Sequence, residues 1–277
     1  MRYTGYMSDI TIPVAPRDLV DELIARGEHW VSLRDVANLL SIPDAQAPAI
    51  MSRLRVKNKV FSPTRGAYVP VPPEFRSWGA VPASHFIDPL MKQLGHYYYV
   101  GLLSAAEIHG AAHQKPQVFQ VVTNARVRNR AFGRVKIEFI YDRKAPVRPT
   151  NIVNTPTGTM HVATSEVTLL DLVYRPNRSG GLSNITTVAS EMLSERKLEI
   201  DRIVKAAVSY PVATVKRTGW ILDQASRLMG IEIETEPLVK LSSQRSEPTP
   251  LDCRHPRAGV LDKRWNVLVN TEIEPDV

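Results

Sequence analysis

The sequence predicts an α+β protein with an N-terminal winged helix-turn-helix domain over residues 1–75 and a larger mixed α+β domain over residues 76–277. Two observations lead there. Helical patterns followed by a basic hairpin occupy Ser32 to Val71, and beyond a proline-rich stretch, strand-like and helical patterns alternate to the C-terminus. With 277 residues and 43% hydrophobic content, the chain is long enough for about two domains with real cores.

The first two helices have clear start and stop signals. The first is predicted between Pro16 and Gly27, because proline favours the start of a helix and glycine favours its end. The second is predicted over residues 33–40. Ser32 caps it, and Asp35 lies near the positive end of the helix dipole.

A third helix is predicted over about residues 45–58. Pro48 is tolerated only in a first turn, which favours a start near Ala47. A strand, a tight turn at residues 63–66 and a second strand over residues 67–71 complete a wing. The third helix is expected to turn inward Ala49, Ile50, Leu54 and Val56.

Seven residues of this region are predicted to contact duplex DNA. The third helix is expected in the major groove, where base edges carry a unique hydrogen-bond pattern. Three side chains are expected at base edges, the other helix cations at phosphates, and the wing tip at the backbone or minor groove. The alternative is a small helical domain with solvated cations. The base-reading set is Gln46, Ser52 and Arg53, the phosphate set is Arg53, Arg55, Lys57 and Lys59, and the wing tip is Arg65.

Closely spaced prolines predict a linker over residues 69–79. Beyond it, apolar periodicity predicts a mixture of strands and helices. Ser104 and Glu107 form a capping-box pattern, and Ser165 is expected to cap the helix that follows it. Strands are predicted over 97–100, 117–123, 135–141, 158–163 and 265–270, and helices over 86–94, 104–110, 166–174, 184–196, 200–209 and 211–229.

The net charge of +7 and the pI of about 9.5 favour a polyanionic partner. Much of the surplus lies between Arg126 and Arg148, which contains eight basic and two acidic side chains. This basic region is predicted to support toxin neutralisation or nucleic-acid contact, with solvated surface charge as the alternative. Its named residues are Arg126, Arg128, Arg130, Arg134 and Lys136.

Other functional classes have little support in the sequence. His109 and His113 have a zinc-helix spacing, but Gly110 disfavours the helix and no third ligand is evident. Cys253 allows no internal disulfide and lacks an identified base. No phosphate-binding loop, nucleophile elbow, membrane span or signal-peptide core occurs. A cytoplasmic protein without enzymatic activity, metal or cofactor is expected.

Three sequence motifs resemble a known family. The first is Arg53-Leu54 followed by Arg65-Gly66-Ala67-Tyr68, and the second is the sequence LSAAEIHG over residues 103–110. The third is VATSEVTLLD over residues 162–171, followed by Pro176 and Gly180-Gly181. In this order the motifs resemble the AbiEi-like antitoxins of bacterial abortive-infection toxin–antitoxin systems, from about residue 16 onward.

The resemblance implies a transcriptional repressor whose N-terminal domain binds an inverted-repeat operator of double-stranded DNA in its own promoter. It further implies a C-terminal domain that counteracts a nucleotidyltransferase-like toxin, directly or indirectly. Under this interpretation Ser104, His109, Glu166 and Asp171 are structural. The alternative function is a general basic DNA- or RNA-binding protein without a toxin partner, which would show only salt-dependent phosphate binding.

Overall fold

The computed structural model describes residues 14–111, 116–243 and 247–276, and the α+β class is confirmed. Two compact units can be distinguished. The first contains the described residues up to Leu90, together with Ala131–Val135 and Thr155–Gly158, and the second contains the remainder.

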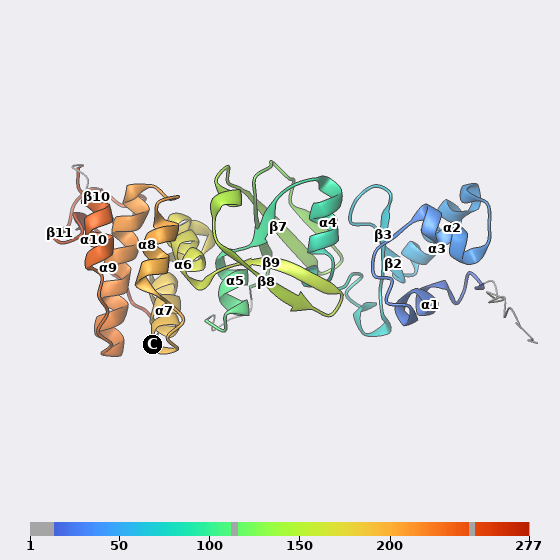
Figure 1. The fold of residues 1–277 in the computed structure, drawn as a ribbon, viewed down its shortest axis with the longest axis horizontal. Coiled ribbons are helices and arrows are strands. Elements are labelled where there is room, and N and C mark those ends of the chain that lie inside the picture. Colours follow the sequence, from blue (N-terminus) through green and yellow to red (C-terminus); the bar gives the residue numbers. More distant parts are fainter. Residues whose placement is uncertain (1–13, 112–115, 244–246, 277) are drawn as a thin grey trace, which may run out of the picture. The chain divides into compact units, whose positions relative to one another are not determined.

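The first unit begins with three helices and a small antiparallel sheet (Figure 1). Its strands have the order β1-β3-β2, with Val31 opposite Tyr68 and Phe61 opposite Val69. A 3₁₀ turn over Asp44–Gln46 precedes α3. The elements are α1 (Leu19–Ala25), β1 (Val31–Ser32), α2 (Leu33–Leu40), α3 (Ala47–Val56), β2 (Val60–Phe61) and β3 (Ala67–Pro70).

Local signals explain where these helices begin and end. The Ser32 hydroxyl accepts the Asp35 N–H at 3.2 Å, and the Asp35 carboxylate accepts the Ser32 N–H at 2.7 Å, so α2 begins with a complete capping box. Pro48 lies in the first turn of α3, as predicted. Asn58 has a φ of 53° and turns the chain from α3 toward β2, a conformation that asparagine tolerates better than most residues.

The predicted inward face of α3 was partly wrong. Ala49 is exposed and Val56 is 83% exposed, whereas Ala47, Met51 and Leu54 are buried. The buried residues follow the i, i+4, i+7 spacing of one helix face and pack in the core formed with α1 and α2. Ile50 is partly buried against the same core.

The proline-rich stretch is not wholly a linker. Val69 and Val71 are buried, and the Val71 N–H donates to the Lys59 carbonyl at 2.8 Å, so the chain is still part of the wing. The first compact unit extends to Leu90. Buried Phe86 packs edge-on against Phe61, with ring centroids 5.1 Å apart, and this contact keeps the following segment within the unit.

The largest sheet has six strands in the order β6-β7-β5-β4-β9-β8. Its strands β7, β8 and β9 are labelled in Figure 1. β4 runs antiparallel to β5 and parallel to β9, and β5 runs parallel to β7. The strands β6 and β8 were not predicted. The bounds are α4 (Ile87–Leu94), β4 (Tyr98–Val100), α5 (Leu102–Ile108), β5 (Phe119–Thr123), β6 (Arg130–Phe132), β7 (Val135–Tyr141), β8 (Thr150–Thr155) and β9 (Gly158–Ala163).

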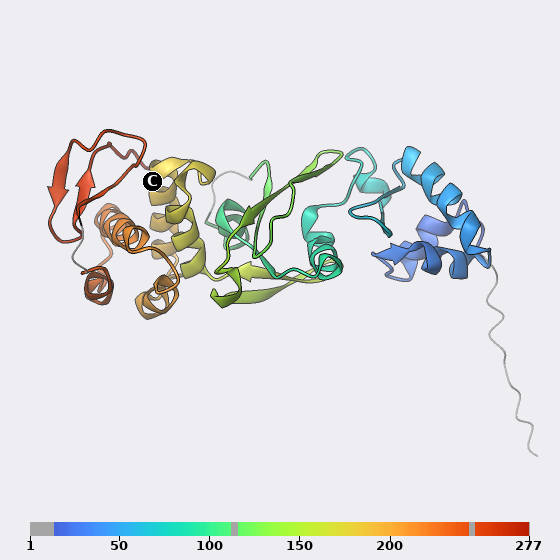
Figure 2. The same ribbon diagram turned by 90° about the horizontal axis from the view of Figure 1, so that it is seen from above.

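The C-terminal part of the second unit is a group of packed helices with a three-stranded sheet. The strands of this sheet are drawn in red in Figure 2. This sheet packs against α9, where Gly219 leaves room for the ring of buried Trp265. The helix α10 and the strands β10 and β11 were not predicted. The elements are α6 (Ser165–Tyr174), α7 (Gly181–Ser194), α8 (Ile200–Ala207), α9 (Val212–Met229), α10 (Glu236–Ser242), β10 (Thr249–Pro250), β11 (Val260–Asp262) and β12 (Val267–Val269).

Two predicted helix caps were wrong. Ser104 lies inside α5, and its buried hydroxyl accepts the Gln120 N–H at 2.9 Å, so it ties the helix to β5. The cap of α6 is Thr164, whose hydroxyl accepts the Val167 N–H. Both errors arise because hydroxyl side chains satisfy either a local helix end or a neighbouring strand, and packing decides which.

Candidate nucleic-acid interface

The helix α3 presents a cationic face opposite its core-facing side. Ser52 and Arg53 are exposed and share this face with Ala49 and Val56, at i, i+3, i+4 and i+7. Arg55 is exposed on the flank of the helix. The helix contains no acidic residue, so its outward face has an uncompensated positive charge.

The remaining predicted contacts surround this face. Gln46 is exposed at the N-terminal end of α3, and Lys57 is exposed at the C-terminal end. Lys59 is only partly exposed because its backbone enters the wing. Arg65 is exposed at the turn between β2 and β3, where Gly66 adopts a φ of 80° that favours glycine.

The structure adds two apolar residues to this candidate interface. Val56 and Ala49 were assigned to the core from the sequence, and both instead lie on the outward face with Arg53. An exposed apolar side chain in a major groove can contact a thymine methyl group. Helical spacing is the signal that would have identified them. Ala47, Met51 and Leu54 follow i, i+4 and i+7, whereas Val56 lies two residues and therefore about 200° around the helix from Leu54.

The predicted basic region in the second part of the chain is not one continuous face. Arg134 directly precedes β7, whereas Arg126 stacks on Tyr141 at its far end, with the guanidinium carbon 5.0 Å from the ring centroid. Lys136 is exposed on β7, but it lies on the opposite face of the strand from Tyr141, because successive strand residues alternate between the two faces. Arg128 is exposed, as are Arg126 and Arg134, but Arg130 is only partly exposed and burial lowers its pKa. Arg148 is buried and does not belong to the surface at all.

Arg148 belongs to a buried network around Asp171. The Asp171 carboxylate accepts hydrogen bonds from Arg148 at 2.8 Å and from the hydroxyls of Tyr99 and Tyr210, each at 2.9 Å. The Arg148 guanidinium also lies 3.9 Å from the Tyr210 ring centroid. Arg175 adds a weaker contact at 3.5 Å. Both carboxylate oxygens therefore have donors, which compensates for burial of the charge.

The surroundings shift the ionisation of this network. Burial by itself lowers the pKa of Arg148, but the Asp171 carboxylate and the two tyrosines outweigh it, and the pKa lies above its ordinary value. Burial raises the pKa of Asp171 against the opposing effect of Arg148 and Arg175. Burial, followed by the charge of Asp171, raises the pKa of Tyr99 and Tyr210, so both hydroxyls remain protonated donors.

His109 also has a structural contact. Its Nε2 lies 2.7 Å from the Ala163 carbonyl oxygen, and burial lowers its pKa, so a neutral ring that donates to this carbonyl fits the geometry. The other histidine of the suggested zinc pair, His113, lies outside the described residues. Among the described residues, no group of three or more potential metal ligands is found. Cys253 is exposed, and Arg217 donates to its sulfur at 2.8 Å.

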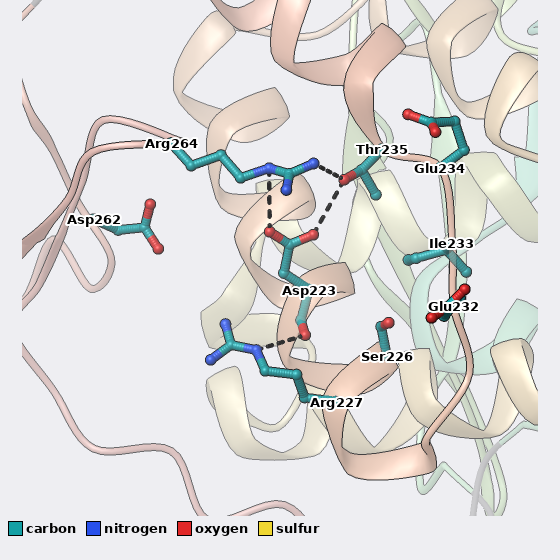
Figure 3. Close-up of a pocket in the computed structure, with 9 residues that line it drawn as sticks. All are labelled: Asp223, Ser226, Arg227, Glu232, Ile233, Glu234, Thr235, Asp262 and Arg264. Atoms are coloured by element: carbon teal, nitrogen blue, oxygen red, sulfur yellow. Dashed lines mark hydrogen bonds and ion pairs between the residues drawn. The ribbon is translucent and has the colours of Figure 1, made fainter.

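A polar pocket of about 720 Å³ lies beside the C-terminal half of α9 (Figure 3). Its central residue, Asp223, accepts a hydrogen bond from Thr235 at 3.2 Å and forms an ion pair with Arg264 at 3.6 Å. Asp223 also accepts the indole N–H of Trp265 at 2.7 Å. These contacts connect α9 to the segments that follow, and they give Asp223, Thr235 and Arg264 a structural role.

The structure thus combines two units. The first carries basic residues on a helix and a wing, and the second is an α+β unit organised around a buried carboxylate–guanidinium network. Residues 99–224 match the family model of the AbiEi antitoxin C-terminal domain. This match confirms the predicted resemblance to AbiEi-like antitoxins over these residues. The AbiEi antitoxin family is not an enzyme family.

The chain is also similar to a solved structure, described as the crystal structure of RV2827C protein from Mycobacterium tuberculosis. The TM-score is 0.64 at 14% sequence identity, and the similarity covers 93% of this chain and 92% of that chain. At this identity the similarity concerns the fold alone. A comparison with curated protein sequences found no match. Within the described part of the chain, every helix is too short or too polar to span a bilayer.

We expect Asp171→Asn to lower the free energy of unfolding by about 3–5 kcal/mol. Arg148 and Arg175 then share Asp142 as their one carboxylate, so one buried positive charge is left uncompensated. Urea unfolding followed by circular dichroism measures this loss. Glu199→Gln is the matched control, since it makes the same kind of change in an exposed ion pair with Arg202 and is expected to cost at most about 1 kcal/mol. Equal stability of the two variants would contradict the structural role of Asp171.

Proposed function

We propose that the chain is a sequence-specific DNA-binding repressor that regulates its own promoter, and an antitoxin that counteracts a nucleotidyltransferase-like toxin, acting in the cytoplasm. The supporting observation is the outward face of α3, where Arg53 and Ser52 lie beside apolar Val56. Three helices followed by a β-hairpin with Arg65 at its tip have the element order of a winged helix-turn-helix. The AbiEi match supports the antitoxin role.

The helix face has the two kinds of contact that sequence-specific binding requires. Arg55 lies on the flank of α3 and Lys57 lies at its C-terminal end, and both cations are placed to approach phosphates. Arg53 and Ser52 occupy the central stripe, from which side chains reach base edges. This division between centre and flank favours a specific reader over a general polyanion binder.

Arg53→Ala and Lys57→Ala are expected to weaken operator binding in different ways. If Arg53 reads a guanine, its loss relaxes preference at one base pair by about 1–3 kcal/mol. Removal of a phosphate-neutralising charge at Lys57 weakens all sequences alike and lowers the salt slope by about one. Fluorescence anisotropy with the promoter fragment and its single-base variants measures both effects.

Arg202→Ala is the control for these two variants, since it removes an exposed cation that lies on α8. It is expected to leave operator affinity unchanged. If the full chain shows no measurable affinity for its own promoter fragment at low salt, the proposal that this protein binds an operator is wrong.

Val56→Ala gives a prediction that depends on the structure and not on charge. The side chain is 83% exposed, so its truncation should change stability by less than about 0.5 kcal/mol. If Val56 contacts a thymine methyl, the variant should lose preference for thymine over uracil at one position. Binding to operators with single thymine-to-uracil replacements measures this, and equal discrimination in Val56→Ala and the parent would exclude the contact.

Operator binding is expected to require two half-sites, because a module of this size covers one half-site and inverted repeats pair two copies about one helical turn or a multiple apart. Inserting about five base pairs between the repeats rotates one half-site to the opposite face of the duplex. Affinity and cooperativity should fall, and an insertion of about ten base pairs, one full helical turn, should restore much of the affinity. Indifference to both insertions would contradict paired binding.

The exposed arginines of the basic region are proposed to support toxin neutralisation or nucleic-acid contact. Reversing Arg126, Arg128 and Arg134 to glutamate should leave the thermal midpoint nearly unchanged, because solvated charges each contribute at most about 1 kcal/mol to stability. Growth during co-expression with the adjacent toxin measures neutralisation. Rescue equal to that of the parent, with operator affinity also intact, would leave these residues as ordinary surface.

A further inference from the structure

The second unit has a cationic sheet edge that operator reading by α3 does not use. β5 and β7 are parallel, with Thr123 aligned to Tyr141, so the carboxyl ends of both strands lie at the same edge. The loop after β5 carries Arg126 and Arg128, and the loop after β7 carries Arg143 and Lys144. In sheets with parallel strands, ligands commonly bind outside these carboxyl ends.

An aromatic ring is exposed at this edge. Tyr141 is 45% exposed, and the Arg126 guanidinium is positioned over its ring at 5.0 Å from the centroid. A tyrosine and a stacked arginine offer two adjacent planar groups on which a nucleobase can stack. The stacking partner must be an unpaired base, because the faces of bases inside a duplex are already occupied by their neighbours.

The turn after Tyr141 buries its acidic residue and exposes its two basic residues. The Asp142 side chain is buried and forms ion pairs with Arg148 at 2.8 Å and Arg175 at 2.6 Å. Its other oxygen accepts the Lys144 N–H at 2.9 Å, which fixes the turn. The carboxylate is therefore neutralised inside the unit, while Arg143 and Lys144 remain exposed outside it.

The local charge balance favours a polyanion. Between residues 117 and 149 the only acidic residues are Glu138 and Asp142, and each is paired with arginine. This edge thus has four exposed cations in its two loops and one exposed ring, and the segment has no unpaired carboxylate. We propose that the edge formed by Arg126, Arg128, Tyr141, Arg143 and Lys144, here called the Tyr141 edge, binds single-stranded nucleic acid, with a base on Tyr141 and phosphates on the cations.

The experiment uses the full chain and fluorescein-labelled RNA and DNA single strands of about 12 nucleotides, with anisotropy as the readout. The parent protein binds both probes, and raising the salt weakens binding. Tyr141→Ala lowers affinity about tenfold or more, whereas Tyr141→Phe, which keeps the ring, retains it. Arg143→Ala with Lys144→Ala lowers the slope of log affinity against log salt by about 0.7 for every phosphate that the protein no longer neutralises.

Three controls separate this proposal from operator binding. Arg53→Ala leaves single-strand affinity unchanged, Tyr141→Ala leaves affinity for the duplex promoter fragment unchanged, and Arg202→Ala leaves both unchanged. The proposal is overturned if neither probe binds at about 50 mM salt. It is also overturned if Tyr141→Ala binds the single strands as well as the parent does, or if its affinities for duplex and single strand fall in parallel. If only operator binding fails, the proposal that the Tyr141 edge binds single strands is not contradicted.

Discussion

The second unit depends on the buried contact between Asp171 and Arg148. Asp171 lies on α6, Arg148 precedes β8, and the tyrosine donors Tyr99 and Tyr210 come from β4 and the segment before α9. Because a buried charge without a partner costs several kcal/mol, these four segments are stable only in the arrangement that brings the donors to the carboxylate. The contact therefore specifies how the helices and the sheet of this unit fit together.

The same network also shapes the protein surface. Arg148 contacts Asp142 as well as Asp171, and the inward position of Asp142 fixes the turn that exposes Arg143 and Lys144. An isolated count of charges between Arg126 and Arg148 treats Arg148 and Asp142 as surface groups, although both are buried. Their mutual neutralisation removes one cation and one anion from the surface, so the excess of exposed positive charge remains.

Features set by local chemistry were predictable from the sequence, and features set by packing were not. The capping residue Ser32 placed the start of α2 correctly because the cap is formed within one turn. The inward face of α3 was misassigned because Val56 is apolar, although it lies about 200° around the helix from buried Leu54. Ser104 was assigned to a cap because its contact with Gln120 comes from a strand distant in sequence. Strand β8 has no strict alternation of buried and exposed residues, so periodicity did not reveal it.

The two candidate surfaces differ in the kind of nucleic-acid group that they are suited to contact. The α3 face is narrow and combines Arg53 with the aliphatic Val56, which matches the hydrogen-bonding and methyl groups that base edges display in a groove. The Tyr141 edge instead offers a flat ring, which matches the face of a base that is exposed only after unstacking. Because groove edges and base faces are not available together on an intact duplex, one double-stranded segment does not satisfy both surfaces. The chemistry of Val56 and Tyr141 therefore suits the two proposed surfaces to different ligands, although the cations of both surfaces are of the kind that attracts phosphates.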